Sequence, residues 1–302
     1  MPQEKIPLIT IQGPTASGKS DLAVTTALTL GTEIISADSR QVYRFLDIGT
    51  AKPTPAEQKI VNHHLIDIIN PDERYNAGRF AGEATTICHQ LWEKGRIPLV
   101  VGGTGFYIKS LLNGLARIPE IPVSIKQKFQ TELDNLGLKF LYERLQKTDA
   151  FTAARIQPND RQRILRALEV QAYTGKPISS FWKEQQQSPE FISFNILLQP
   201  ERNMLYSRID QRLDQMLQAG LLDEISSLLE KGYNQNDPGL KTVGYQEFLP
   251  CLLNDHSLDD CLKLAKQHSR NYAKRQITWY KKVDFNLTIT ANKVNFSKVL
   301  KS

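Results

Sequence analysis

The sequence predicts an α/β protein with a parallel-sheet core and an all-helical insertion. Three observations support this class. Strand-like apolar runs alternate with helical patterns in both halves of the chain, a phosphate-binding loop joins the first strand to the first helix, and a charged helical stretch separates the two α/β segments. We therefore expect a catalytic core formed by residues 1–118 and 191–302, with C-terminal helices, and a helical domain over residues 119–190.

A phosphate-binding loop follows the first strand. The apolar run over residues 6–11 leads into the motif G-x-x-x-x-G-K-[ST], and a helical pattern begins at Asp21. In such a P-loop, backbone N–H groups and the lysine face phosphate oxygens, and the last hydroxyl binds Mg²⁺. We therefore expect a site for a diphosphate or nucleotide, with Lys19 on the phosphates and Ser20 on the metal. The loop residues are Gly13, Pro14, Thr15, Ala16, Ser17, Gly18, Lys19 and Ser20.

Two further short strands bring polar residues to the same edge of the sheet. Residues 32–37 predict a strand that ends at Asp38, and residues 96–101 predict a buried strand followed by Gly102-Gly103-Thr104. Ligands bind outside the carboxyl ends of parallel strands, so we expect Asp38 beside the P-loop. The second of these strands stands where P-loop hydrolases and kinases usually carry a metal-binding aspartate, and it has none. The missing aspartate favours a reaction in which diphosphate is the leaving group.

The remaining elements follow from periodicity and from their start and stop residues. We expect an extended segment over 63–69, helices over 77–94, 106–112, 125–136, 138–147 and 161–173, a strand over 191–198, and helices over 202–219 and 259–280.

Charge indicates a polyanionic partner without proving one. The chain of 302 residues has 38 Lys and Arg against 32 Asp and Glu, a formal net charge of +6. The basic residues concentrate in two groups, and a solvated surface is the simpler explanation of either group alone. They are Arg155, Arg161, Arg163 and Arg166 in the insertion, and Lys266, Arg270, Lys274, Arg275, Lys281 and Lys282 near the end.

Composition argues against several other classes of protein. No apolar run approaches the roughly 20 residues of a membrane span. The three cysteines form no C-x-x-C pair, which argues against a zinc site or a disulfide framework. Residues 1–5 lead directly into the first strand, so we expect no targeting peptide and a cytoplasmic location. We also expect the chain to be a monomer.

The residues alone leave several functions open. A P-loop serves kinases, nucleotide switches and enzymes whose leaving group is diphosphate. Asp38 could accept a proton from a nucleophile in the last class, or could instead cap a helix or bind metal through water. A kinase of nucleotides and a non-catalytic RNA-binding switch are therefore alternatives to transfer with a diphosphate leaving group.

Eight segments together carry a family resemblance. In chain order they are Gly13 to Ser20, Asp38 to Tyr43, Asp47 to Pro53, His63 to Asp67, Gly102 to Tyr107, Asn159 to Arg163, Val243 to Tyr245 and Lys274 to Trp279. With these segments the chain resembles the tRNA dimethylallyltransferase family, also called tRNA isopentenyltransferases or IPP transferases, over nearly its whole length. The resemblance implies transfer of the dimethylallyl group of dimethylallyl diphosphate to N6 of the adenosine just 3′ of the anticodon, with Mg²⁺ as cofactor and the tRNA anticodon stem-loop as partner.

The resemblance also implies roles for individual residues. Asp38 matches the general base, Thr104 a position at the reaction channel, and Arg212 an arginine that contacts diphosphate together with Lys19 and the P-loop. Where family members commonly have Arg-Cys-Val-Gly-Tyr-Arg-Gln, this chain has Lys241-Thr242-Val243-Gly244-Tyr245-Gln246-Glu247, with two arginines fewer and one acid more. The residues implied to contact tRNA are Asp38, Ser39, Arg40, Gln41, Gln162, Arg163, Ile164, Leu165, Arg166, Lys241, Gly244 and Tyr245.

Overall fold

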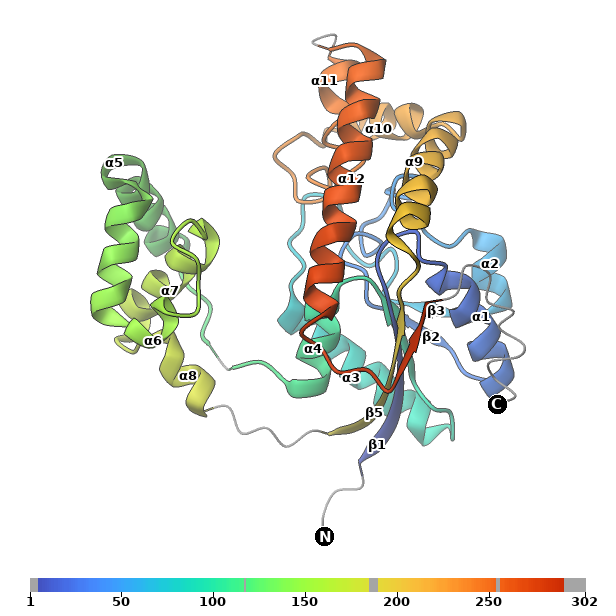
Figure 1. Ribbon diagram of the computed structural model, residues 1–302, viewed down its shortest axis with the longest axis horizontal. Coiled ribbons are helices and arrows are strands. Elements are labelled where there is room, and N and C mark those ends of the chain that lie inside the picture. Colours follow the sequence, from blue (N-terminus) through green and yellow to red (C-terminus); the bar gives the residue numbers. More distant parts are fainter. Residues whose placement is uncertain (1–4, 117, 185–189, 254–255, 291–302) are drawn as a thin grey trace. The chain divides into compact units, whose positions relative to one another are not determined.

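The chain divides into two compact units in the structure, a computed structural model that describes residues 5–116, 118–184, 190–253 and 256–290 (Figure 1). The first unit contains residues 1–113 and 189–302, and the second contains residues 114–188. Residue 117 and residues 185–189, at the edges of the expected insertion, lie outside the described residues.

The first unit is built on a six-stranded sheet in the order β3-β2-β4-β1-β5-β6. All neighbouring strands pair in parallel, so the predicted α/β class with a parallel sheet is confirmed. The strands are β1 Ile6–Gln12, β2 Ile34–Ser36, β3 His63–His64, β4 Leu99–Gly102, β5 Phe191–Leu198 and β6 Leu287–Ile289.

The segment expected to be extended over residues 63–69 is a strand only at His63–His64. Leu65 and Asp67 have φ values of 62° and 56°, in the left-handed region that ends a strand. The prediction of one continuous extended segment was therefore wrong, because the chain turns at Leu65 and Asp67 and the apolar pattern does not show these turns.

Helices cover both faces of the sheet. Alternate residues of β1 face opposite layers: Leu8 belongs to the core under α3 (Ala77–Glu93) and α4 (Gly105–Asn113), and Ile11 to the core under α1 (Lys19–Leu30). A further short helix, α2 (Pro55–Ile60), precedes β3. The two layers leave the carboxyl ends of the strands accessible for a ligand.

A third core lies beyond the carboxyl ends of the strands. It contains α9 (Arg202–Gln218), α10 (Leu221–Glu230), α11 (Leu249–Leu252) and α12 (Leu258–Tyr280), packed against residues 42–46 and 240–249. The helices α9 and α12 lie side by side (Figure 1), and two ion pairs join them, Lys266 to Asp214 at 2.6 Å and Arg270 to Asp210 at 2.6 Å. Two members of the basic group near the end are thus paired within the protein.

The second unit is helical and has its own core. It contains α5 (Val123–Thr148), α6 (Ala150–Ala153), α7 (Arg161–Thr174) and α8 (Ile178–Glu184). Gly137, at φ 78°, interrupts α5 between the two helices that the sequence predicts, and Gly175, at φ 71°, ends α7 as expected.

Candidate functional site

A pocket of about 410 Å³ lies within the first unit, at the carboxyl ends of β1, β2 and β4. Of the residues singled out in the sequence, this pocket brings together Thr15, Lys19, Ser20, Asp38, Arg40, Gln41, Arg212 and Lys241. Residues 162–166, expected to contact tRNA, belong to the second unit.

The pocket is strongly basic. Among the described residues that line it, Asp38 is the single acidic side chain. Five basic side chains line the same space: Lys19, Arg40, Arg212, Lys241 and Arg275. A concave site with this balance of charge favours an anionic ligand.

The P-loop has the backbone that a phosphate site needs. A Cβ on Gly13 would lie 2.6 Å from the carbonyl oxygen of Leu198, so only glycine fits there. Gly18, at φ 88°, caps α1, whose first residue is Lys19. The N-terminus of a helix attracts anions, and here it opens on the pocket.

Lys19 is held inside the pocket. Its Nζ donates to the carbonyl oxygen of Pro14 at 3.0 Å. Burial lowers the pKa of Lys19 to about 8, the neighbouring Asp38 carboxylate opposes that shift, and Arg212 adds to it. Burial likewise lowers the pKa of Arg212, again opposed by Asp38. The three charged groups therefore act on one another across the pocket.

Asp38 both faces the pocket and fixes a turn. Its Oδ1 accepts from the backbone N–H of Arg40 at 2.8 Å and, more weakly, from that of Gln41 at 3.4 Å. No helix starts at this point in the described residues, so the alternative of a helix cap is wrong; Asp38 instead fixes a turn from a position in the pocket. Thr104 accepts from the N–H of Ser39 at 3.1 Å through its hydroxyl and so ties the end of β4 to the same turn.

Three residues of α12 complete the site and were not predicted. Gln276 accepts from the N–H of Thr15 at 2.9 Å and donates to the carbonyl oxygen of Gly103 at 2.9 Å, joining the P-loop to the loop after β4. The hydroxyl of Tyr280 lies 3.2 Å from the Gly13 carbonyl oxygen. Tyr272 lines the pocket, and burial raises its pKa to about 12. These three residues lie four positions apart, a spacing that places them on one face of a helix and could have indicated their common role.

Two residues predicted to contact tRNA have buried side chains. Tyr245 is fully buried; its hydroxyl donates to Glu224 at 2.5 Å and accepts from the N–H of Gly49 at 3.1 Å. Ile164 is fully buried in the core of the second unit. In this structure both side chains pack inside the protein, which stabilises the fold through the apolar surface that they bury.

The other predicted tRNA residues differ in exposure. Gly244 is buried and donates its N–H to Glu247 at 2.7 Å. Gln162 and Arg163 are exposed, while Leu165 and Arg166 are half-buried. Within the second unit, therefore, Gln162 and Arg163 are the most available for a contact.

Comparison with known proteins identifies the family. The family model described as IPP transferase matches residues 41–283, and the one described as isopentenyl transferase matches residues 6–73. The chain belongs to the IPP transferase family. A tRNA dimethylallyltransferase of Syntrophobacter fumaroxidans is 44% identical over 279 residues, covering 91% of this chain and 81% of that protein. One of Geobacter sulfurreducens is 42% identical over 279 residues, covering 92% and 90%.

Solved structures show the same similarity. A tRNA delta(2)-isopentenylpyrophosphate transferase from Staphylococcus epidermidis matches with a TM-score of 0.71 and 37% identity, covering 98% of this chain and 97% of that one. A eukaryotic dimethylallyltransferase acting on tRNA matches with a TM-score of 0.81 and 31% identity, covering 94% and 74%. Members of the IPP transferase family thus share both the sequence and the architecture of this chain.

None of the helices among the described residues has the length and apolar character needed to cross a membrane. That part of the chain also has no cluster of three or more His, Cys, Asp or Glu side chains arranged to hold a metal ion.

Proposed function

We propose that this chain transfers the dimethylallyl group of dimethylallyl diphosphate to N6 of the adenosine just 3′ of the anticodon in tRNA. The products are N6-dimethylallyladenosine and diphosphate. The observation that carries the proposal is the pocket, in which a P-loop and five basic side chains surround the single carboxylate of Asp38. Membership of the IPP transferase family and relatives named tRNA dimethylallyltransferase support the same reaction.

The basic side chains suit a departing diphosphate. As N6 attacks the allylic carbon, a C–N bond forms and the C–O bond to diphosphate breaks, with the electron pair leaving on oxygen. Lys19, Arg212 and the amides of the P-loop face the region where that negative charge grows, so they stabilise the transition state more than the ground state.

Asp38 would accept the proton that N6 loses. An aromatic amine is a weak nucleophile, and removing its proton as the new bond forms assists the attack. The Asp38 carboxylate lines the pocket with the basic groups, and one of its oxygens is fixed by the turn at Arg40. Thr104, bonded to the same turn, positions it.

A magnesium ion fits the residues present. Mg²⁺ usually keeps several waters and binds through one or two protein oxygens together with substrate phosphates. The exposed hydroxyl of Ser20 lines the pocket and offers such an oxygen. Ser20 would hold the ion together with waters and the phosphates of the substrate, and the ion would neutralise charge on the diphosphate.

The tRNA would be held by both units. The target base is stacked in the anticodon loop and has to be extruded before the pocket can receive it. Arg40 and Lys241 line the pocket, and Gln162, Arg163 and Arg166 of the second unit offer contacts to phosphates of the anticodon stem. A tRNA substrate supports a cytoplasmic site of action, and we propose a monomer as the working form.

A nucleotide kinase is the alternative that a P-loop suggests. The end of β4 counts against it, because Gly102-Gly103-Thr104 lacks the aspartate that usually organises Mg²⁺ around a γ-phosphate. Prenyl transfer to a free adenine nucleotide would not need the basic residues of the second unit.

The test is transfer of label. The protein is incubated with labelled dimethylallyl diphosphate, undermodified tRNA and Mg²⁺, and in parallel with AMP, ADP or ATP in place of tRNA. We expect label in tRNA alone. Label only in a free nucleotide, or none in either acceptor, would refute the proposal.

A variant tests the proposed base. Asp38→Asn keeps the size of the side chain and an oxygen for the turn, so we expect diphosphate affinity to stay within about threefold while the rate of transfer falls by about a hundredfold or more. Single-turnover rates and titration with inorganic diphosphate measure the two effects. Near-normal turnover would show that another group accepts the proton.

A further inference from the structure

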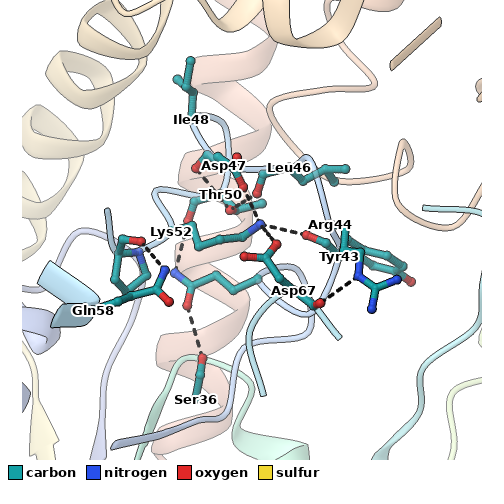
Figure 2. Close-up of polar contacts among 12 residues, drawn as sticks. Ser36, Tyr43, Arg44, Leu46, Asp47, Ile48, Thr50, Lys52, Gln58 and Asp67 are labelled. Carbon is teal, nitrogen blue, oxygen red and sulfur yellow. Dashed lines mark hydrogen bonds and ion pairs between the residues drawn. The ribbon is translucent and has the colours of Figure 1, made fainter. Parts of the chain in front are cut away.

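The ammonium group of Lys52 is almost completely buried, with 3% of its side chain exposed, and does not line the pocket. Its Nζ donates to the carbonyl oxygen of Tyr43 at 2.8 Å, to Oδ1 of Asp47 at 2.5 Å and to Oδ1 of Asp67 at 2.5 Å (Figure 2). All three N–H donors of an ammonium are therefore used. Lys52 thereby holds the turn before α2 to the segment after β3.

A chain of hydrogen bonds leads from Lys52 to the pocket. The backbone N–H of Asp67 donates to the carbonyl oxygen of Gln41 at 3.2 Å, and the N–H of Gln41 donates to Oδ1 of Asp38 at 3.4 Å. The amide group of Gln41 is fixed as well, since it accepts from Ser36 Oγ at 3.1 Å and donates to the Ala51 carbonyl oxygen at 3.2 Å. Movement of Asp67 would thus be transmitted to the turn that carries Asp38.

The segments that Lys52 joins are in a conformation that needs outside support. Ala51, Leu65 and Asp67 have φ values of 45°, 62° and 56°, in the left-handed region that costs free energy for residues other than glycine. Such backbone persists only where surrounding contacts fix it. The Lys52 ammonium is a contact of this kind for Asp67.

We propose that Lys52 is a positioning residue for the transfer reaction, which it supports by fixing Asp67 and, through Gln41, the turn that places Asp38. This inference rests on the proposed function of Asp38 as the base that accepts the N6 proton. The P-loop lies outside the hydrogen bonds that join Lys52, Asp67, Gln41 and Asp38, so we expect binding of the allylic diphosphate to change much less than the rate of transfer.

Removing the ammonium would separate its two carboxylate partners. Oδ1 atoms of Asp47 and Asp67 both lie 2.5 Å from one nitrogen, so without Lys52 they repel each other at short range. The backbone N–H groups of Asp47 and Ile48 are held independently by Glu224, at 3.0 and 2.8 Å. The Asp67 backbone is bonded to Arg44, whose Nε donates to its carbonyl oxygen at 3.0 Å, and directly to Gln41. Movement of Asp67 therefore reaches Gln41, whereas the Asp47 segment is anchored on Glu224.

The test compares Lys52→Met with two conservative variants of its partners in the full-length protein. Lys52→Met should lower the single-turnover rate at saturating tRNA and dimethylallyl diphosphate by about 10- to 100-fold, since small misplacement of a reacting group has effects of this size. The KM for dimethylallyl diphosphate should change by less than about twofold. Asp67→Asn should lower the rate in the same direction, and Asn tolerates the left-handed backbone at this position.

Asp47→Asn is the matched control. It weakens a contact to the same nitrogen at the same distance, yet its segment stays fixed by Glu224, so the single-turnover rate should remain near that of the wild type. Thermal unfolding of each variant shows the folded fraction to which the rates are normalised.

Several outcomes would overturn the inference. A folded Lys52→Met with a normal single-turnover rate would do so, as would equal losses of rate in Asp67→Asn and Asp47→Asn. A higher KM for dimethylallyl diphosphate with an unchanged rate would also do so. If Lys52→Met does not fold, the comparison of Asp67→Asn with Asp47→Asn still decides the matter. An inactive wild-type protein would instead refute the proposed function.

Discussion

Replacing Tyr245 by phenylalanine separates a packing role from contact with tRNA. The Tyr245 hydroxyl donates to the carboxylate of Glu224 at 2.5 Å inside a fully buried site. A hydrogen bond to a charged group contributes about 1.5–3 kcal/mol to stability. The N–H of Gly49, which donates to the same hydroxyl, also lies 3.3 Å from Glu224 Oε1 and so keeps an acceptor. We therefore expect Tyr245→Phe to lower the free energy of unfolding by about 2 kcal/mol.

Thermal and urea unfolding measure this loss. For a chain of 302 residues, about 2 kcal/mol corresponds to a melting temperature lower by roughly 3 °C. Tyr206→Phe is the control, because the hydroxyl of Tyr206 bonds to Arg202 at an exposed position and its loss should change stability by less than about 0.5 kcal/mol. The KM of Tyr245→Phe for tRNA should change by less than about threefold. Unchanged stability with a KM for tRNA raised tenfold or more would refute the reasoning.

Three other perturbations test the site. Because burial lowers the pKa of Lys19 to about 8, affinity for inorganic diphosphate should fall as pH rises above 8, with proton uptake on binding, measured by calorimetry in two buffers. Since that folded-state pKa lies below the ordinary value of 10.5, deprotonation of Lys19 between these pH values favours the folded state, so unfolding at this group cannot explain the loss. Gly13→Ala should weaken diphosphate binding by about tenfold or more, because the new Cβ would lie 2.6 Å from a backbone oxygen; normal binding by a folded variant would contradict this. Arg163→Ala should raise the KM for tRNA and reduce the slope of log affinity against log salt by about 1, while an effect on diphosphate affinity alone would contradict its assignment.

Local sequence patterns predicted those elements well whose start and end are determined by residues within the element itself. The P-loop, the buried strand ending at Gly102 and the helix ended by Gly175 each carry their start or stop residue within a few positions, and the structure has them there. The strand β6 at Leu287–Ile289 was not predicted, since a three-residue edge strand exists only through pairing with β5. The prediction of an extended segment over residues 63–69 was wrong for a related reason. Asp67 has a left-handed backbone, and its side chain is paired with Lys52, a residue outside that segment.

The sequence predicted which residues belong to the site better than it predicted the contacts that their side chains make. Asp38, Lys19 and Arg212 were placed in one pocket by motif and resemblance, and the structure brings them together. Tyr245 shows why contacts are harder to predict than motifs. A tyrosine in a segment that matches the family does not reveal from the sequence whether its hydroxyl binds RNA or, as here, a buried carboxylate. Burial is a property of the whole packed unit and has no local signature in the sequence.

The contacts of α12 determine when the diphosphate site can form during synthesis of the protein. Thr15 and Gln276, whose hydrogen bond closes the phosphate site, are separated by 261 positions, and Gly13 and Tyr280 by 267. A ribosome synthesises Thr15 261 positions before Gln276. The nascent chain therefore has the residues that bind phosphate long before it has the helix that fixes them, and the diphosphate site can mature only after α12 has been made.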